Sequence, residues 1–264
     1  MGIKTPLAKD RLDHILVTCG LAQSRDAATR MILAGEIKVA GMVVDKPGKN
    51  IPTDATIEIC KQGTRYVSRG GEKLLAALEA CAINVAGKTC LDVGCSTGGF
   101  TDCLLQHGAS RVYAIDVGYG QFDWRLRQDP RVVLHERTNV RYVDSSIIPE
   151  WVDVVVIDVS FISLAKVLPP IIPFLRPSAI VIALVKPQFE VGKGQVGRGG
   201  IVREEAQRQS VLQRVLTVAS DLGLQTRKSL DSPLKGKKGN LELLAIFEFS
   251  PPSCGMKEDL SHQS

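Results

Sequence analysis

The feature that most constrains the fold of this chain is a regular alternation, from residue 70 onward, of short apolar runs with amphipathic segments. The runs are apolar at consecutive positions, which is typical of strands buried on both faces of a mostly parallel sheet. We therefore predict an α/β domain over residues 70–250, with a doubly wound sheet covered by helices on both faces. The predicted strands are 88–94, 111–116, 131–136, 151–158, 179–186 and 241–249, and the predicted helices are 73–81, 99–107, 161–174 and 203–221.

The first sixty residues follow a different pattern and form a separate unit. Two amphipathic helices are predicted over 10–20 and 24–35, the first of them capped by Asp10. The two-residue period of strands follows, with a turn at Ala40-Gly41. We predict a small α+β domain over residues 1–61, a linker over 62–69 and a disordered tail over 251–264.

Composition limits the classes of protein to which the chain can belong. Hydrophobic residues make up 44% of the sequence, yet no apolar run approaches the ~18 residues of a membrane span. The first residues carry charges and no secretory leader, so we expect a cytoplasmic protein without a membrane partner. The seven cysteines form no CxxC pair and the four histidines lack ligand spacing, so we expect neither disulfides nor a metal site. A net charge of +5 is too small to decide nucleic-acid binding.

A glycine-rich segment, DVGCSTGGF, follows the first predicted strand of the α/β domain, from Asp92 to Phe100. Ligands of such sheets bind at the carboxyl ends of the strands, where glycines let the backbone approach a ligand closely. Asp116 ends the next strand, 22 positions after Gly94, and a carboxylate there can accept hydrogen bonds from both hydroxyls of a ribose. The motif favours a nucleoside cofactor, and NAD is one candidate. Against NAD, Ser96 stands where a dinucleotide motif needs its second glycine to make room for a pyrophosphate.

Four charged residues are expected near the same edge of the sheet. Asp158, Lys186 and Glu242 stand at the ends of predicted strands, and Lys73 lies on the helix that precedes the sheet. Each of them alone is more typical of a solvated strand end than of a catalytic group. Together, in this order along the chain, they resemble the Lys-Asp-Lys-Glu tetrad of the FtsJ-type ribose 2′-O-methyltransferases.

Further segments widen this resemblance. The glycine-rich segment resembles motif I of S-adenosylmethionine methyltransferases, and residues 9–60 resemble the S4 RNA-binding domain in RLD, SRDAATRMILAGEIKVAG and VDKPG. This sequence has Ala40-Gly41 where the S4 family commonly has Asn-Gly. With DVGYGQ, RTN, DVSFISL and VKPQFE, the chain resembles the TlyA family over residues 9–249. That family joins an S4 domain to an FtsJ-like rRNA cytidine-2′-O-methyltransferase, and some of its members are called hemolysins.

The resemblance implies a Rossmann-like methyltransferase fold, S-adenosyl-L-methionine as cofactor, and a cytidine ribose of ribosomal RNA as substrate. Lys186 would activate the 2′-hydroxyl, because an ammonium stabilises the negative charge that develops on it, and Asp158 would hold Lys186. Lys73 and Glu242 would position the ribose, and either Lys186 or water would take the proton. The cofactor residues that it implies are Asp92, Gly94, Ser96, Thr97, Gly98 and Phe100 around the methionine, Asp116 at the ribose and Asn139 near the adenine.

Cations in two regions are candidate contacts to RNA phosphates. The first region is the N-terminal unit, where a merely solvated charged face is an equally good interpretation. The second is the glycine-rich stretch between Lys186 and Glu204, which is either a loop that grips RNA or a flexible linker. A non-catalytic ribosome-assembly factor and a membrane-lytic hemolysin are the rival functions. The candidate RNA contacts are Arg11, Arg25, Arg30, Lys38, Lys46, Lys193 and Arg198.

Overall fold

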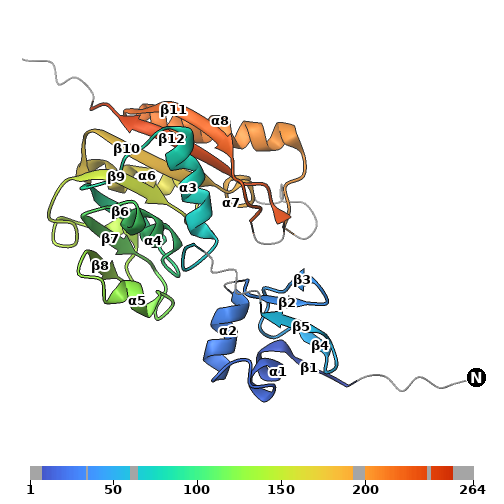
Figure 1. Ribbon diagram of the computed structural model, residues 1–264. Helices are drawn as coiled ribbons and strands as arrows, with labels where there is room; N and C mark the ends of the chain where they lie inside the picture. Colours follow the sequence, from blue (N-terminus) through green and yellow to red (C-terminus); the bar gives the residue numbers. More distant parts are fainter. Residues whose placement is uncertain (1–7, 34, 60–64, 193–199, 237–238, 252–264) are drawn as a thin grey trace, which may run out of the picture. The chain divides into compact units, whose positions relative to one another are not determined.

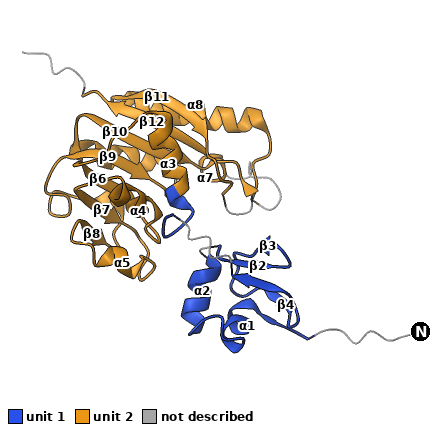
Figure 2. Cartoon of the chain, viewed as in Figure 1, with its two compact units in different colours: residues 1–71 blue, residues 72–264 orange. Residues whose placement is uncertain are grey.

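The structure is a computed structural model of the whole chain, and it describes residues 8–33, 35–59, 65–192, 200–236 and 239–251. Figure 2 shows the two compact units into which the chain divides, residues 1–71 and residues 72–264. Each unit has its own strands and its own buried core. Lys193 and Arg198 lie outside the described residues.

The N-terminal unit packs two helices against small antiparallel sheets (Figure 1). Leu12, Leu16 and Ile32 are fully buried between them. Ala40 and Gly41 both have positive φ angles, 49° and 76°, as a tight hairpin turn between β2 and β3 requires. The elements are β1 (Lys9–Arg11), α1 (Leu12–Thr18), α2 (Arg25–Leu33), β2 (Ile37–Val39), β3 (Met42–Val43), β4 (Asn50–Pro52) and β5 (Ile57–Ile59).

The start of the first helix differs from the prediction. Asp10 does not cap it, because Asp10 belongs to β1 and pairs with Ile51 of β4. The N-cap position is taken by Arg11, whose side chain makes no capping hydrogen bond. The guanidinium of Arg11 instead donates to the carboxylate of Asp13. An acidic residue in the first turn of the helix therefore fixes the Arg11 side chain.

The C-terminal unit is the predicted doubly wound α/β domain (Figure 1). Its strands lie in the order β11-β12-β10-β9-β6-β7-β8, and the pairs from β10 to β8 are parallel. β12 runs antiparallel to β10, and β11 runs antiparallel to β12. The strands are β6 (Thr89–Val93), β7 (Arg111–Ile115), β8 (Val132–His135), β9 (Val152–Ile157), β10 (Leu175–Val185), β11 (Leu224–Asp231) and β12 (Leu243–Phe249).

Helices cover this sheet, and one of the predicted helices is broken. Residues 161–174 form three short pieces, because Pro169, Pro170 and Pro173 each lack the N–H that a continuous helix needs. The pieces are the 3₁₀ turn η2 (Leu164–Lys166), α6 (Leu168–Ile171) and the 3₁₀ turn η3 (Ile172–Phe174). The others are α3 (Gly70–Ala80), α4 (Gly99–Gln106), α5 (Trp124–Arg127), the 3₁₀ turn η1 (Val140–Tyr142), α7 (Pro187–Glu190) and α8 (Glu205–Asp221). None of the helices that the structure describes is long and apolar enough to cross a bilayer.

The topology gathers the predicted site residues at one edge of the sheet. The chain winds outward from β6 through β7 to β8 and then returns to form β9 on the other side of β6. Such a reversal of strand order opens a crevice beyond the carboxyl ends of the two central strands. The glycine-rich loop follows β6 and Asp158 follows β9, so both lie at this crevice.

Candidate active site

The loop after β6 approaches the end of β9 so closely that its first residue must be glycine. Gly94 has a φ angle of +84°, and a Cβ atom there would lie 2.6 Å from the carbonyl oxygen of Asp158. Gly98, the N-cap residue of α4, has a φ angle of +94°, and a Cβ atom there would lie 2.5 Å from Leu126 Cδ1. The two glycines therefore set the course of the loop. Between them, Ser96 is exposed and Thr97 half-buried, whereas Phe100 is buried in α4.

Asp116 joins this loop to the next one. Its carboxylate accepts hydrogen bonds from the backbone N–H of Ser96 at 2.8 Å and from that of Gly118 at 2.6 Å. The backbone carbonyl of Asp116 accepts from the N–H of Thr138, in the loop after β8. Each carboxylate oxygen has a second lone pair, so the half-buried side chain retains the capacity to accept from a ribose diol. This acceptor capacity fits the ribose hydroxyls in the nucleoside part of S-adenosylmethionine.

Asp92 lies beneath the loop and not on its open side. The side chain is fully buried, and its Oδ2 accepts a 2.6 Å hydrogen bond from Thr101 Oγ1 on α4. Its Oδ1 has no hydrogen-bond partner among the described residues. Burial, reinforced by the negative charges of Asp158 and Asp116, raises the pKa of Asp92 to about 7. The expected contact of Asp92 with the methionine part stays a prediction, made for a carboxylate that is buried beneath the loop.

We predict that Asp92→Asn flattens the dependence of stability on pH. The folded pKa of about 7 lies above the unfolded value of ~3.9, so the folded state favours the protonated carboxyl. That contribution is complete below about pH 4 and is lost as the pH rises through 7, a change on the order of 3–4 kcal/mol. Unfolding temperatures measured from pH 5 to 8 should fall more steeply for the wild type than for Asp92→Asn. The exposed control Asp54→Asn should behave like the wild type, and parallel profiles of the wild type and Asp92→Asn would contradict the assignment.

Two ion pairs assemble the four charged residues of the predicted tetrad. Lys186, directly after β10, places its Nζ 2.6 Å from Asp158 Oδ1, and this ammonium also donates to Ser160 Oγ at 2.9 Å. Lys73 of α3 places its Nζ 2.5 Å from Glu242 Oε2. The antiparallel register pairs Val185 with Leu243, so Lys186 and Glu242 stand at neighbouring positions on adjacent strands.

The two pairs differ in exposure. The Glu242 side chain is 3% exposed and that of Lys73 is 12% exposed, which makes this pair nearly buried. Asp158 is 25% exposed and lies at the crevice, whereas Lys186 is 11% exposed. An ammonium held between a carboxylate and a hydroxyl, as Lys186 is here, can orient a substrate hydroxyl and stabilise an alkoxide. No group of three potential metal ligands occurs among the residues that the structure describes.

Arg137, a neighbour of the site, was not predicted as a site residue. Arg137 stacks over the ring of Tyr119 at 4.0 Å, and its backbone N–H donates to the carbonyl of Gly118. The segments DVGYGQ and RTN contain both residues, so the resemblance carried a signal for them. Asn139, expected near the adenine, accepts a hydrogen bond from the N–H of Arg141 and so caps η1. Its half-buried side chain thereby holds the loop after β8.

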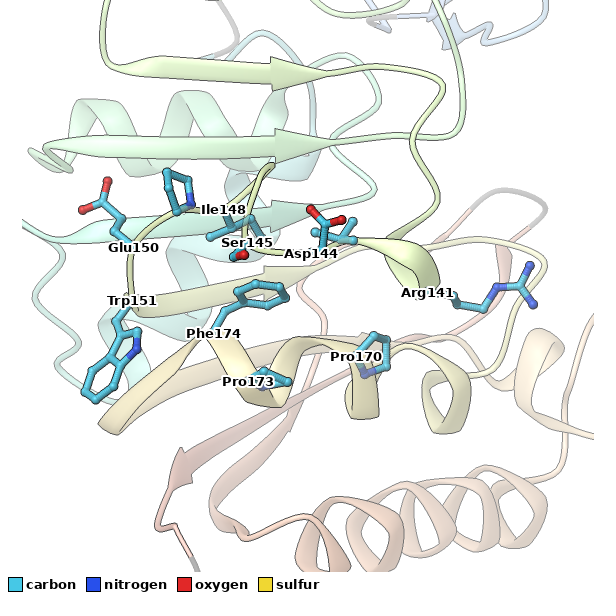
Figure 3. Close-up of a pocket in the computed structure, with 11 residues that line it drawn as sticks. Arg141, Asp144, Ser145, Ile148, Glu150, Trp151, Pro170, Pro173 and Phe174 are labelled. Atoms are coloured by element: carbon cyan, nitrogen blue, oxygen red, sulfur yellow. The ribbon is translucent and has the colours of Figure 1, made fainter.

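A separate groove of about 510 Å³ lies at the opposite edge of the sheet, where the strands begin. Trp151 precedes β9 and Phe174 precedes β10, and Figure 3 shows both among the side chains that line it. Asp116, Asp158 and Lys186 follow their strands at the other edge, and Glu242 precedes the antiparallel β12 there. The groove is therefore not part of this site.

Comparison with known protein families shows to which family the chain belongs. The profile of the FtsJ-like methyltransferase family matches residues 66–249, and that of the S4 domain matches residues 10–57. The chain belongs to the FtsJ-like methyltransferase family. The predicted Rossmann-like methyltransferase fold with an N-terminal S4 domain is thus confirmed.

Individual relatives place the chain more narrowly. It is 48% identical, over 233 residues, to the 16S/23S rRNA (cytidine-2′-O)-methyltransferase TlyA of Mycobacterium tuberculosis, and the match covers 88% of this chain and 87% of the relative. A solved Streptococcus thermophilus protein, described as a candidate hemolysin, is 42% identical with a TM-score of 0.73 and covers 93% of this chain and 90% of its own. A solved Listeria monocytogenes protein, described as a candidate S-adenosylmethionine-dependent methyltransferase, is 17% identical with a TM-score of 0.52. It covers 69% of this chain and 99% of its own, and its likeness shows the fold alone. The resemblance to the TlyA family is confirmed.

The S4 domain of this FtsJ-like protein holds two of the predicted RNA contacts in one cluster. The buried carboxylate of Asp13 accepts two hydrogen bonds from Arg11, and it pairs with Arg25 at 3.5 Å. These contacts, those of Arg11 first, lower the pKa of Asp13 to about 2. Both guanidiniums are at least half exposed, at 50% and 58%, and are therefore held in place while facing solvent. Arg30 on α2 and Lys46 are exposed, and Lys38 on β2 is half-buried.

Proposed function

We propose that this protein transfers a methyl group from S-adenosylmethionine to the 2′-hydroxyl of a cytidine in ribosomal RNA. The observation that carries the proposal is the pairing of Lys186 with Asp158 at the mouth of the crevice beside the glycine-rich loop. The name of the M. tuberculosis relative supports the substrate, since nearly half of the matched residues are identical. The exposed arginines of the S4 domain support an RNA partner.

The cofactor would be held by the loop from Gly94 to Gly98 and by the carboxylate of Asp116. Gly94 and Gly98, both with positive φ angles, set the course of this loop, and its backbone would contact the methionine part. When bound, S-adenosylmethionine supplies an electrophilic methyl group on a cationic sulfur. The carboxylates of Asp116, bonded to this loop, and of Asp158, after β9, would suit a cationic ligand better than a pyrophosphate.

Lys186 is assigned to the substrate hydroxyl. Its Nζ would donate to the 2′-oxygen and stabilise the negative charge that develops as the new C–O bond forms and the C–S bond breaks. Asp158 and Ser160 hold the ammonium in place, so no reorganisation is needed during the reaction. The hydroxyl proton leaves either to Lys186, when that amine is neutral, or to water late in the step. Lys73 on α3 and Glu242, directly before β12, are paired with each other and would position the ribose.

An aromatic pair lies beside this group and offers a surface for the nucleobase. The ring of Phe161 lies 4.8 Å from that of Phe189, at an angle of 48°. Phe161 is 90% exposed and belongs to the same short loop as Asp158 and Ser160. Unstacked RNA bases commonly rest on exposed aromatic rings. We assign the pair to the cytosine of the target nucleotide.

Transfer of a labelled methyl group to rRNA tests the proposal. Purified protein, labelled S-adenosylmethionine and ribosomal subunits from cells that lack this protein should yield a 2′-O-methylcytidine, located by mapping the modified rRNA. Asp116→Ala should weaken binding of S-adenosylmethionine in a calorimetric titration. Binding of rRNA without any methyl transfer would favour the non-catalytic assembly factor and overturn the proposal. Tight binding of NAD with no response to S-adenosylmethionine would also overturn it.

We predict that Arg11→Ala combined with Arg25→Ala weakens RNA binding and flattens its salt dependence. Each lost phosphate contact should lower the slope of log affinity against log salt by about one unit. The cofactor affinity should not change, because these arginines and the glycine-rich loop belong to different units. Filter binding of rRNA at several salt concentrations measures the slope. A slope equal to that of the wild type would assign the two arginines to a solvated surface.

A further inference from the structure

A single carboxylate joins the two loops that carry Asp158 and Lys186. Glu190, at the end of α7, accepts a 2.6 Å hydrogen bond from Ser163 Oγ through its Oε2. Its Oε1 accepts a 2.8 Å hydrogen bond from the backbone N–H of Leu164. Ser163 and Leu164 belong to the segment that follows β9, whereas Glu190 belongs to the segment that follows β10. The carboxylate thus bridges the two segments.

This bridge is the last of three contacts between the same segments, in matching order along both. At the sheet, Lys186 contacts Asp158 and Ser160. Next along the chain, the ring of Phe189 packs on that of Phe161. Glu190 closes the series at Ser163 and Leu164. The two loops therefore form one ladder of contacts that starts at the reactive ammonium.

The residue in the middle of the ladder has a backbone conformation that it would not adopt by itself. Phe161 has a φ angle of +64°, a region that a bulky side chain rarely occupies. Its own ring, 90% exposed, has little burial to stabilise that conformation. The chain is fixed on both sides, by the bond from Lys186 to Ser160 and by the bonds from Ser163 and Leu164 to Glu190. A strained residue persists when its surroundings determine it in this way, and such residues concentrate at functional sites.

We infer that Glu190 is a positioning residue, which fixes the loop of Phe161 so that the base surface and the Lys186 ammonium face the same nucleotide. This inference rests on the proposed function, because it assigns a purpose to a geometry beside the methyl-transfer site. Glu190 itself acts through Ser163 and Leu164 and is not assigned a contact with the substrate. A merely local role, as a cap for the turn η2, is the alternative, and Ser163 already provides one such cap by accepting from the N–H of Ala165.

Three variants of the full chain separate these roles. Glu190→Ala removes both hydrogen bonds and should slow single-turnover methyl transfer to rRNA at least tenfold, with the affinity for S-adenosylmethionine unchanged. Glu190→Gln should stay within about threefold of the wild type, because its amide oxygen can accept from Leu164 and its NH₂ can donate to Ser163 Oγ. Ser163→Ala removes one of the two bonds to Glu190, together with the cap of η2, and should fall between the two. Glu79→Ala, an exposed change on α3, is the matched control and should behave like the wild type.

Amide hydrogen exchange gives a measurement that does not depend on activity. The segment 161–166 should exchange faster in Glu190→Ala than in the wild type, and Glu190→Gln should restore the slow exchange. Faster exchange with an unchanged transfer rate would overturn the positioning role, as would a Gln variant as slow in transfer as the Ala variant. If the wild type itself transfers no methyl group, the proposed function fails, whereas unaltered exchange in Glu190→Ala would overturn the bridge alone.

Discussion

Lys186→Ala is expected to slow methyl transfer at least a hundredfold. The ammonium is held at 2.6 Å from Asp158 and donates to Ser160, so it is oriented before substrate arrives. Its charge acts on an oxygen that becomes negative during the reaction and much less on the neutral hydroxyl of the ground state. Removal of one such preorganised donor costs about 3 kcal/mol of transition-state stabilisation, which corresponds to a factor of about a hundred or more in rate.

Single-turnover kinetics on ribosomal subunits measures this loss directly. The affinities for RNA and for S-adenosylmethionine should remain close to those of the wild type, as expected for an interaction made in the transition state. Lys186→Arg should not restore the rate, because a planar guanidinium cannot replace a compact ammonium between the carboxylate and the hydroxyl. Turnover near the wild-type rate in Lys186→Ala would remove this residue from the mechanism.

Glu242→Ala is expected to lower the free energy of unfolding of the C-terminal unit by about 3–5 kcal/mol. The change leaves the ammonium of Lys73, only 12% exposed, without the carboxylate that now lies 2.5 Å away. An uncompensated charge in a nearly buried site costs far more than the intact pair contributes. Denaturant unfolding at neutral pH, followed by a signal from the C-terminal unit, measures the difference.

A double-mutant cycle identifies the cause of that loss. Lys73→Met removes the ammonium and keeps an unbranched side chain of similar length, so Lys73→Met with Glu242→Ala should be more stable than Glu242→Ala alone. Both forms should be inactive in methyl transfer, since both lack the tetrad. Additive destabilisation by the two changes would show that the cost of losing Glu242 comes from the space that it fills beside Gly236, and not from the charge of Lys73.

The fold was predictable where burial on both faces makes a strand continuously apolar. The predicted strands of the C-terminal unit all exist, whereas β11 was not predicted. Its sequence, LQTRKSLD, lies at the edge of the sheet and is mostly exposed, so it carries neither an apolar run nor a clear alternation. The prediction of one helix over 161–174 was wrong for a different reason. It relied on the spacing of the apolar residues and gave too little weight to the three prolines.

The candidate site was predictable as a set of residues but not as a set of contacts. Order along the strands indicated that Asp158 and Lys186 share an edge, since parallel strands end together. The bond of Lys186 to Ser160 and the bridge made by Glu190 depend on loop conformation, which leaves no periodic signal in sequence. The burial of the Asp92 side chain was not predictable either, because the sequence does not indicate on which side of the glycine turn that side chain lies.

The antiparallel course of β12 has a consequence for folding of the protein during its synthesis. Because β12 returns along β10, the residue that contacts Lys73 comes 169 positions later along the chain. Domains fold largely in the order in which they leave the ribosome during synthesis. The S4 domain can thus be complete while the tetrad still lacks its final member inside the exit tunnel. A nascent chain would therefore be inactive in methyl transfer until β12 has emerged. It would be inactive while it lies beside ribosomal RNA, the kind of RNA that the finished enzyme is proposed to modify.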